Sequence, residues 1–212
     1  MLLQRKFRPV FLIAICALST LSTLSFAEER GKALFNLCMS CHGQQGEGGS
    51  PAIGAPAIAG LPAWYIAAQL EKFSTNVRGM HPDDTAGHLM RPMARTLIYK
   101  DDIKTISAYV ASLKAATPPA TTGGNAERGK AYYPVCMSCH GPKGEGNEAL
   151  KAPSLKISND WYLVNQLMKF KHKQRASDPK KDPTGATMAP MAATLPDEQA
   201  MKDVIAYIQS LK

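Results

Sequence analysis

Apolar residues recur three or four positions apart in two segments, one ending near residue 114 and the other at the end of the chain. This spacing predicts an amphipathic helix in each segment. Acidic residues begin both segments, Asp101 and Asp102 in one and Asp197 and Glu198 in the other, where the helix dipole favours negative charge. The apolar positions are Ile103, Ile106, Val110 and Leu113 in the first segment, and Met201, Val204, Ile205, Ile208 and Leu211 in the second.

Four other segments carry helical signals. Residues 29–37 and 127–135 form one predicted pair of helices, and residues 64–73 and 161–170 form another. No segment shows a comparable alternation of apolar and polar residues, which would indicate a strand, so the predicted fold class is all-α. The apolar face of the fourth segment consists of Trp161, Val164, Leu167 and Met168.

The helices fall into two sets because the chain contains an internal repeat. A shift of 98 positions places residues 29–33 on residues 127–131 with identical sequence, and a shift of 97 aligns the middle of each copy. The shift returns to 98 for the remainder, and both changes fall in loop-like stretches. We therefore predict two copies of one domain, residues 28–114 and 127–212, joined by an exposed linker at residues 115–126.

The first 27 residues have the layout of an export signal. Arg5, Lys6 and Arg8 precede an apolar run at residues 10–18, and residues 25–27 (Ser-Phe-Ala) offer a cleavage site. The alternative is an uncleaved membrane anchor, but the apolar run is short and is followed by serine and threonine residues. We predict that the signal is removed near Ala27.

A five-residue motif, Cys-Met-Ser-Cys-His, occurs once in each copy, and it is the attachment pattern of c-type haem. The two thiols add across the porphyrin vinyl groups, and the histidine binds the iron. Disulfide pairing would not explain the histidine after each pair, and 94 residues separate the two pairs, too many for an ordinary zinc site. We predict two covalently bound haem c groups, attached through Cys38, Cys41, Cys136 and Cys139, with His42 and His140 as iron ligands.

The sixth ligand of each iron should be a residue that both copies share. Met90 and Met188 lie 48 residues beyond their motif histidine, and Met93 and Met191 lie 51 residues beyond it. Both pairs are expected in an irregular stretch before the last helix, where a loop could bring thioether sulfur to iron. A His/Met pair closes the iron and favours electron transfer over catalysis. The candidates without a counterpart are Met80, His81, His88 and His172, which are expected in loops or ordinary packing.

These motifs, and the repeat that carries them, resemble the cytochrome c4 family of exported bacterial dihaem cytochromes. The resemblance implies two tandem class I cytochrome c domains, each wrapped around one covalent haem, and it implies a periplasmic location, often at the membrane face. It selects Met90 and Met188 as the axial ligands. Further implied roles are a hydrogen bond from each ligating histidine to the carbonyl of Pro56 or Pro153, and a close crossing of the first and last helices at Gly31 and Gly129, near Tyr109 and Tyr207.

Charge limits the classes of partner. The formal net charge of +8 becomes +5 without the first 27 residues. With two propionates on each haem, the first copy would be near −1 and the second near +2, which argues against nucleic-acid binding. One basic cluster could dock an acidic redox partner or could be a solvated loop face. It contains Lys169, Lys171, Lys173, Arg175, Lys180 and Lys181.

The predicted function is electron transfer by an exported dihaem cytochrome between redox protein partners, and the resemblance implies delivery to a terminal oxidase. The chain itself is not expected to be an enzyme. One alternative is an electron-accepting subunit of a periplasmic dehydrogenase that acts on sulfide or thiosulfate. The other is a dihaem peroxidase, which would need an iron with an open site, whereas both copies offer the same methionines.

Overall fold

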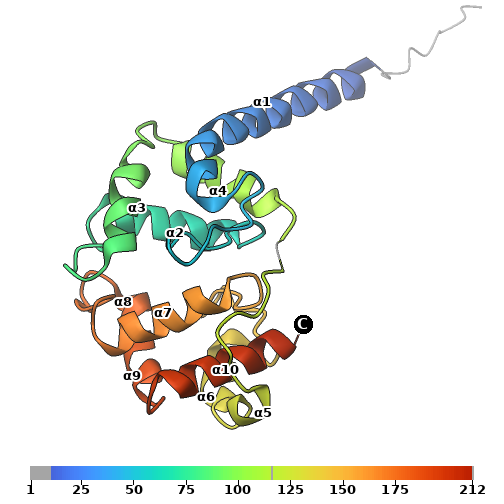
Figure 1. Ribbon diagram of the computed structural model, residues 1–212. Helices are drawn as coiled ribbons and strands as arrows, with labels where there is room; N and C mark the ends of the chain where they lie inside the picture. The colour runs from blue at the N-terminus through green and yellow to red at the C-terminus, as the bar shows by residue number, and fades with distance from the viewer. Residues whose placement is uncertain (1–10, 116, 212) are drawn as a thin grey trace, which may run out of the picture.

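The computed structural model describes residues 11–115 and 117–211, with side chains from residue 26 onwards. Over that range the fold is helical, with one isolated bridge between Asn147 and Ala152 and no strand. The first domain lies above the second in Figure 1. Its helices are α1 (Phe11–His42), α2 (Ala63–Ser74), α3 (Thr85–Arg95) and α4 (Asp102–Ser112). Those of the second are α5 (Ala126–Gly129), α6 (Tyr133–His140), α7 (Asp160–Lys171), α8 (Pro183–Ala186), α9 (Met188–Ala193) and α10 (Glu198–Ser210).

Each domain has its own core, built on the predicted last helix. In the first domain Ile106 and Val110 of α4 are buried with Phe35 of α1. In the second, Val204 and Ile208 of α10 are buried with Tyr133 of α6. These are equivalent positions of the repeat, so the amphipathic pattern correctly predicted which face of each last helix is buried.

The first and last helices of each domain cross closely at a glycine. A Cβ atom on Gly31 would lie 2.5 Å from the Cβ of Tyr109. A Cβ on Gly129 would overlap the backbone carbonyl of Asp203, rather than Tyr207 as expected. Any side chain at these two positions would therefore push the helices apart.

The helix before each haem motif differs between the domains. In the first domain α1 runs unbroken from Phe11 to His42. In the second, the helix predicted over residues 127–135 is split into α5 and α6, and Pro134 stands in the first turn of α6. Proline has no backbone N–H and its ring clashes with the carbonyl four residues earlier, so it starts a helix but cannot continue one.

The predicted signal peptide lies partly outside the described residues. Residues 1–10 are not described, and α1 begins at Phe11 and continues through the predicted cleavage site near Ala27. Within the part of the chain that the structure describes, no helix is both long enough and apolar enough to cross a membrane.

The stretch between the domains is held in place by α7. The carboxylate of Asp160 accepts hydrogen bonds from the Thr122 amide at 2.7 Å and from the Thr121 hydroxyl at 2.8 Å. Further along, the Asn125 amide donates to Asp203 at 2.7 Å. Most of these linker residues are exposed, as their composition predicted, but they are fixed to the second domain.

Candidate haem sites and the interface between the domains

The motif cysteines lie in the last turns of α1 and α6. Cys38 and Cys136 are half-buried, Cys41 and Cys139 are exposed, and none of the four is in a disulfide. Burial raises the pKa of Cys38 to about 11, with a smaller contribution from neighbouring Cys41, and burial raises the pKa of Cys136 to about 11. Both groups are therefore protonated thiols at neutral pH.

Each motif histidine is oriented by a proline carbonyl. His42 Nδ1 lies 2.7 Å from the carbonyl oxygen of Pro56, and His140 Nδ1 lies 2.8 Å from that of Pro153. Burial lowers the pKa of both histidines, and these hydrogen bonds only partly oppose the effect. The imidazoles are therefore neutral, with Nδ1–H donating to the carbonyl and the Nε2 lone pair available for a metal.

The four candidate methionines lie in helices, so the prediction of an irregular stretch was wrong. Met90 and Met93 belong to α3, and Met188 begins α9. The missed signal is an N-cap aspartate in each copy, Asp84 on α3 itself and Asp182 on α8, the helix just before α9. Asp84 accepts a hydrogen bond from the Gly87 amide at 3.0 Å, and Asp182 from the Gly185 amide at 2.8 Å.

Burial separates the two pairs of methionines. Met90 and Met188 are half-buried, whereas Met93 and Met191 are each 37% exposed. A residue that binds iron inside a haem crevice must turn its sulfur away from solvent, so the first pair fits that task better. Of the candidates without a counterpart in the repeat, Met80 is 53% exposed and His172 is exposed just beyond α7, whereas His81 and His88 are half-buried like Met90.

Sequence comparison assigns the family. The family model for cytochrome c matches residues 28–114 and again residues 126–212. The chain belongs to the cytochrome c family. It consists of two tandem cytochrome c domains, which implies covalent haem c, and the two Cys-x-x-Cys-His motifs support two haems.

The resemblance to cytochrome c4 is confirmed by individual relatives. The chain is 27% identical to a cytochrome c4 of Azotobacter vinelandii over 87% of this chain and 88% of that one. The structure of reduced recombinant cytochrome c4 from Pseudomonas stutzeri superposes with a TM-score of 0.69 at 26% identity, covering 87% of this chain and 98% of that one. A thiosulfate dehydrogenase electron acceptor of Thiomonas intermedia (strain K12) is 31% identical over 67% of this chain, which spans 66% of its length.

Two reciprocal ion pairs join the domains. Lys72 of α2 reaches Asp182 at 2.6 Å, and Lys169 of α7 reaches Asp84 at 2.5 Å. The lysines are equivalent in the repeat, and so are the aspartates. The two domains therefore face each other across a pseudo-twofold axis, as identical subunits do in a symmetric dimer.

Two buried arginines lie between the ion pairs. Arg78 donates to Gln69 at 2.9 Å and, across the interface, to Gln166 at 2.9 Å. Arg175 makes the same two contacts in reverse, to Gln166 at 2.8 Å and to Gln69 at 2.9 Å. Each guanidinium also packs on a ring of its own domain, over Phe73 or Phe170.

This interface corrects the interpretation of the basic cluster. Lys169 and Arg175 are buried against the other domain, and Lys171 donates to the backbone carbonyls of Leu195 and Pro196. Only Lys173, Lys180 and Lys181 remain as exposed cations. Two of the six cations, Lys169 and Arg175, therefore belong to the interface between the domains and are not available to dock a partner.

The interface carries more positive than negative charge. Lys72, Lys169 and the two arginines face only the carboxylates of Asp84 and Asp182. Nε of Arg78 and Nε of Arg175 are buried without a hydrogen-bond partner among the described residues. Burial alone would raise the pKa of Tyr162, but the two guanidiniums lower it below its usual range. Orphaned donors and an excess of buried cations fit a group that brings carboxylates, as haem does.

Proposed function

We propose that the chain is an electron carrier with two haem c groups, bound through Cys38 and Cys41 in the first domain and Cys136 and Cys139 in the second. His42 and Met90 would be the axial ligands of one iron, and His140 and Met188 those of the other. Bound haem supplies the one-electron chemistry. The chain attaches it, orients the ligands, excludes water and docks partners.

The observation that carries this proposal is the identical arrangement in both domains. Each motif imidazole is neutral, held through Nδ1 by a prolyl carbonyl and free at Nε2. Each domain has a half-buried methionine at the same place in the repeat. An iron closed on both sides has no position for substrate, which favours a carrier over a peroxidase.

The interface adds support because it fixes the domains relative to each other. Buried ion pairs and arginine–glutamine contacts hold one arrangement, so the distance between two bound haems would be constant. We propose that Arg78 and Arg175 stabilise haem propionates there, which would balance the excess positive charge. An electron could then enter through one domain and leave through the other.

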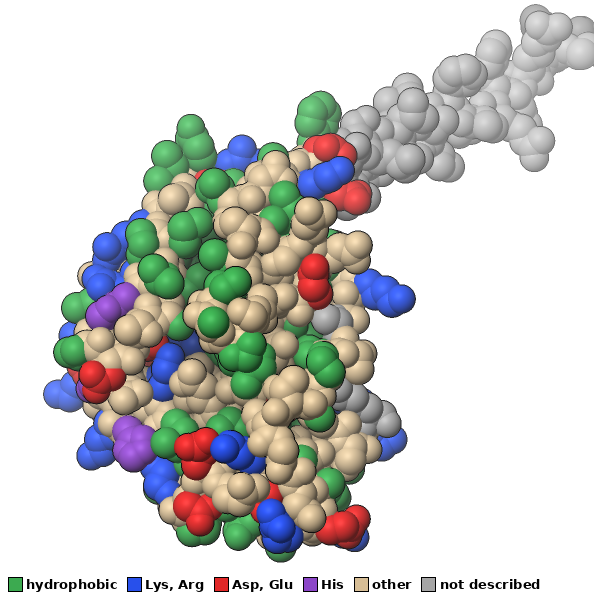
Figure 2. Space-filling model, viewed as in Figure 1, with side chains coloured by type: hydrophobic (Ala, Val, Ile, Leu, Met, Phe, Trp, Pro, Cys, Tyr) green, Lys and Arg blue, Asp and Glu red, His purple; other side chains and the backbone are tan. Residues whose placement is uncertain are grey.

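Donor and acceptor are proposed to dock on different domains. Exposed large apolar side chains, among them Leu37, Ile53 and Leu89, are concentrated on the first domain, and in Figure 2 apolar side chains gather on that upper half. The second domain carries more charged residues, 13 basic and 9 acidic in residues 117–212 against 9 and 8 in residues 28–116. In stopped-flow experiments the two reactions should therefore differ in salt dependence. Competition of both partners for one domain would contradict this.

We propose that the protein is located in the periplasm, where it can associate with the membrane surface, and that a terminal oxidase accepts its electrons. The second candidate function is electron acceptor for a thiosulfate dehydrogenase, which the similarity to such an acceptor favours. Adding thiosulfate and a thiosulfate dehydrogenase to the oxidised protein discriminates between them. Rapid reduction of both haems would favour the second candidate, and rapid oxidation by a membrane oxidase would favour the first.

Ligation is tested by absorption and magnetic circular dichroism of Met90→Leu and Met188→Leu. Each change should remove half of the long-wavelength iron–sulfur band, because each removes one of two thioether ligands. Met93→Leu and Met191→Leu are the matched controls and should leave the band unchanged. Loss of the band in the control variants would mean that the second methionine of each pair is the ligand.

A further inference from the structure

One hydrogen bond across the interface, close to His42, has no counterpart on the other side. The side-chain Oδ1 of Asn159 accepts from the backbone amide of Ala57, in the other domain, at 2.7 Å. Ala57 is fully buried and Asn159 is 8% exposed. Asn159 occupies the N-cap position of α7, yet its side chain makes no capping hydrogen bond there. An asparagine in this position normally caps its own helix, whereas the Asn159 side chain binds the other domain instead.

The amide that Asn159 binds belongs to the peptide group that orients His42. The carbonyl of the Pro56–Ala57 peptide accepts from His42 Nδ1 at 2.7 Å, and the N–H of the same peptide donates to Asn159. The peptide is trans, so its carbonyl and N–H point in opposite directions. The result is a continuous chain of hydrogen bonds from Asn159 through one peptide group to His42.

Hydrogen bonds in such a chain polarise one another. An acceptor on the Ala57 N–H makes the Pro56 carbonyl oxygen more negative and strengthens its bond to His42 Nδ1–H. A stronger bond at Nδ1 makes Nε2 more basic, and a more basic ligand stabilises ferric over ferrous iron.

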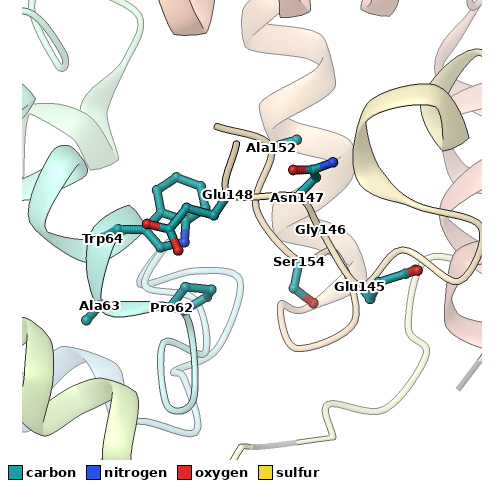
Figure 3. A pocket seen from close by; sticks show the side chains of 9 residues that line it. All are labelled: Pro62, Ala63, Trp64, Glu145, Gly146, Asn147, Glu148, Ala152 and Ser154. Carbon is teal, nitrogen blue, oxygen red and sulfur yellow. The ribbon is translucent and has the colours of Figure 1, made fainter. Parts of the chain in front are cut away.

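The second domain has no equivalent chain. The position that corresponds to Asn159 is Pro62, which has no side-chain acceptor. The amide that corresponds to Ala57 is that of Ser154, which makes no hydrogen bond to another described residue. Pro62 and Ser154 instead line a cleft of about 570 Å³ between the domains (Figure 3). The interface is thus closed by Asn159 on one side and open at the matching place on the other.

We propose that Asn159 is a positioning residue of the second domain that selectively lowers the reduction potential of the haem in the first domain. The inference rests on the proposed ligation by His42 and His140. Two haems with the same ligands are thereby made unequal, and the electron of the half-reduced protein is biased towards the second domain.

The test is Asn159→Leu, which keeps the branched shape and removes the acceptor. In the half-reduced holoprotein, the ratio of reduced haem in the first domain to that in the second should rise about threefold. Removing a direct hydrogen-bond partner of a metal ligand changes metal affinity or activity about ten- to hundredfold. The expected effect here is smaller because Asn159 acts on His42 through one further hydrogen bond. At 59 mV per tenfold, the threefold change corresponds to about 28 mV. Haem methyl resonances assign the electron to a domain.

A second readout does not depend on electron distribution. In ¹H–¹⁵N spectra of the fully reduced protein, the Ala57 amide proton should move upfield in Asn159→Leu, while the Ser154 amide should not move. Asn159→Asp keeps an acceptor, so it should leave Ala57 downfield and lower the ratio. Asn165→Leu and Asn165→Asp make the same changes at an exposed position of α7 and control for charge and for general effects on the helix.

An unchanged ratio and an unchanged Ala57 amide in Asn159→Leu, with both iron–sulfur bands intact, would overturn the role of Asn159 and leave the electron-carrier proposal standing. Equal shifts in Asn159→Asp and Asn165→Asp would also overturn it, since that result needs only the added charge. Absence of His/Met ligation in the unaltered protein would instead refute the electron-carrier proposal itself.

Discussion

Breaking one of the two interdomain ion pairs should be costly, and the two pairs should differ in cost. The side chains of Lys169 and Asp84 are 9% and 2% exposed. Removing one partner of a buried pair costs about 3–5 kcal/mol because an uncompensated charge remains. Asp84 also accepts from the Gly87 amide, which partly stabilises a lone carboxylate. We expect Lys169→Met to lower the free energy of unfolding by about 3 kcal/mol.

The equivalent change in the other pair, Lys72→Met, is the matched comparison. The Lys72 side chain is 18% exposed, so water would solvate the carboxylate of Asp182 more readily, and we expect a cost of about 1–2 kcal/mol. Urea unfolding of the holoprotein, followed by circular dichroism and by haem absorbance, measures both values.

The double variant Lys169→Met with Asp84→Asn completes the test. A neutral asparagine can still cap α3 and leaves no buried charge, so the double variant should recover at least half of the stability lost in Lys169→Met. If Lys169→Met lowers the free energy of unfolding by less than about 0.5 kcal/mol, the reasoning is refuted, since an exposed surface ion pair contributes about that much. A double variant less stable than Lys169→Met would refute it as well.

Two further predictions concern acid and helix crossing. Burial raises the pKa of Asp84 and of Asp182, but the hydrogen bonds and charges of Lys169 and Lys72 outweigh it and hold both pKa values below the usual range. Both carboxylates therefore add to the free energy of unfolding above about pH 4, the pKa of an unfolded aspartate. This stabilisation is lost as pH falls through their lower pKa values in the folded protein. Below about pH 4 the free energy of unfolding should therefore fall less steeply with pH in Asp84→Asn than in the unaltered protein. An unchanged dependence on pH would contradict this. Gly129→Ala should destabilise the second domain by about 1–3 kcal/mol and more than Gly31→Ala destabilises the first, because its methyl group meets backbone rather than a side chain. Thermal melting of the two variants measures the difference, and equal melting temperatures would contradict it.

The repeat made most of the fold predictable. Aligned copies showed that Ile106 and Val204 occupy buried helix faces, and the family resemblance implied the contacts of His42 and His140 with prolines, which the structure contains. These features are local, so spacing along the chain determines them.

The interface was not predictable in the same way because its contacts join residues about a hundred positions apart. Lys169 and Arg175 read as members of an exposed basic cluster, yet both are buried. One signal was present: Lys72 and Asp84 recur in the second copy as Lys169 and Asp182, although solvated lysines and aspartates are under no obligation to recur. A charged pair retained in both copies of a repeat is a candidate for a contact between them.

The reciprocal pairing of Lys72 with Asp182 and of Lys169 with Asp84 has a consequence for the linker. Each domain presents the same residues to the other, so the interface is one that two identical molecules could form. In a homodimer every substitution appears twice, and an asparagine at one cap requires an asparagine at the other. Joining the halves in one chain removes that requirement, while the tether keeps the partner at high effective concentration. The linker therefore permits Asn159 on one side and Pro62 on the other, and with them a preferred direction for the electron.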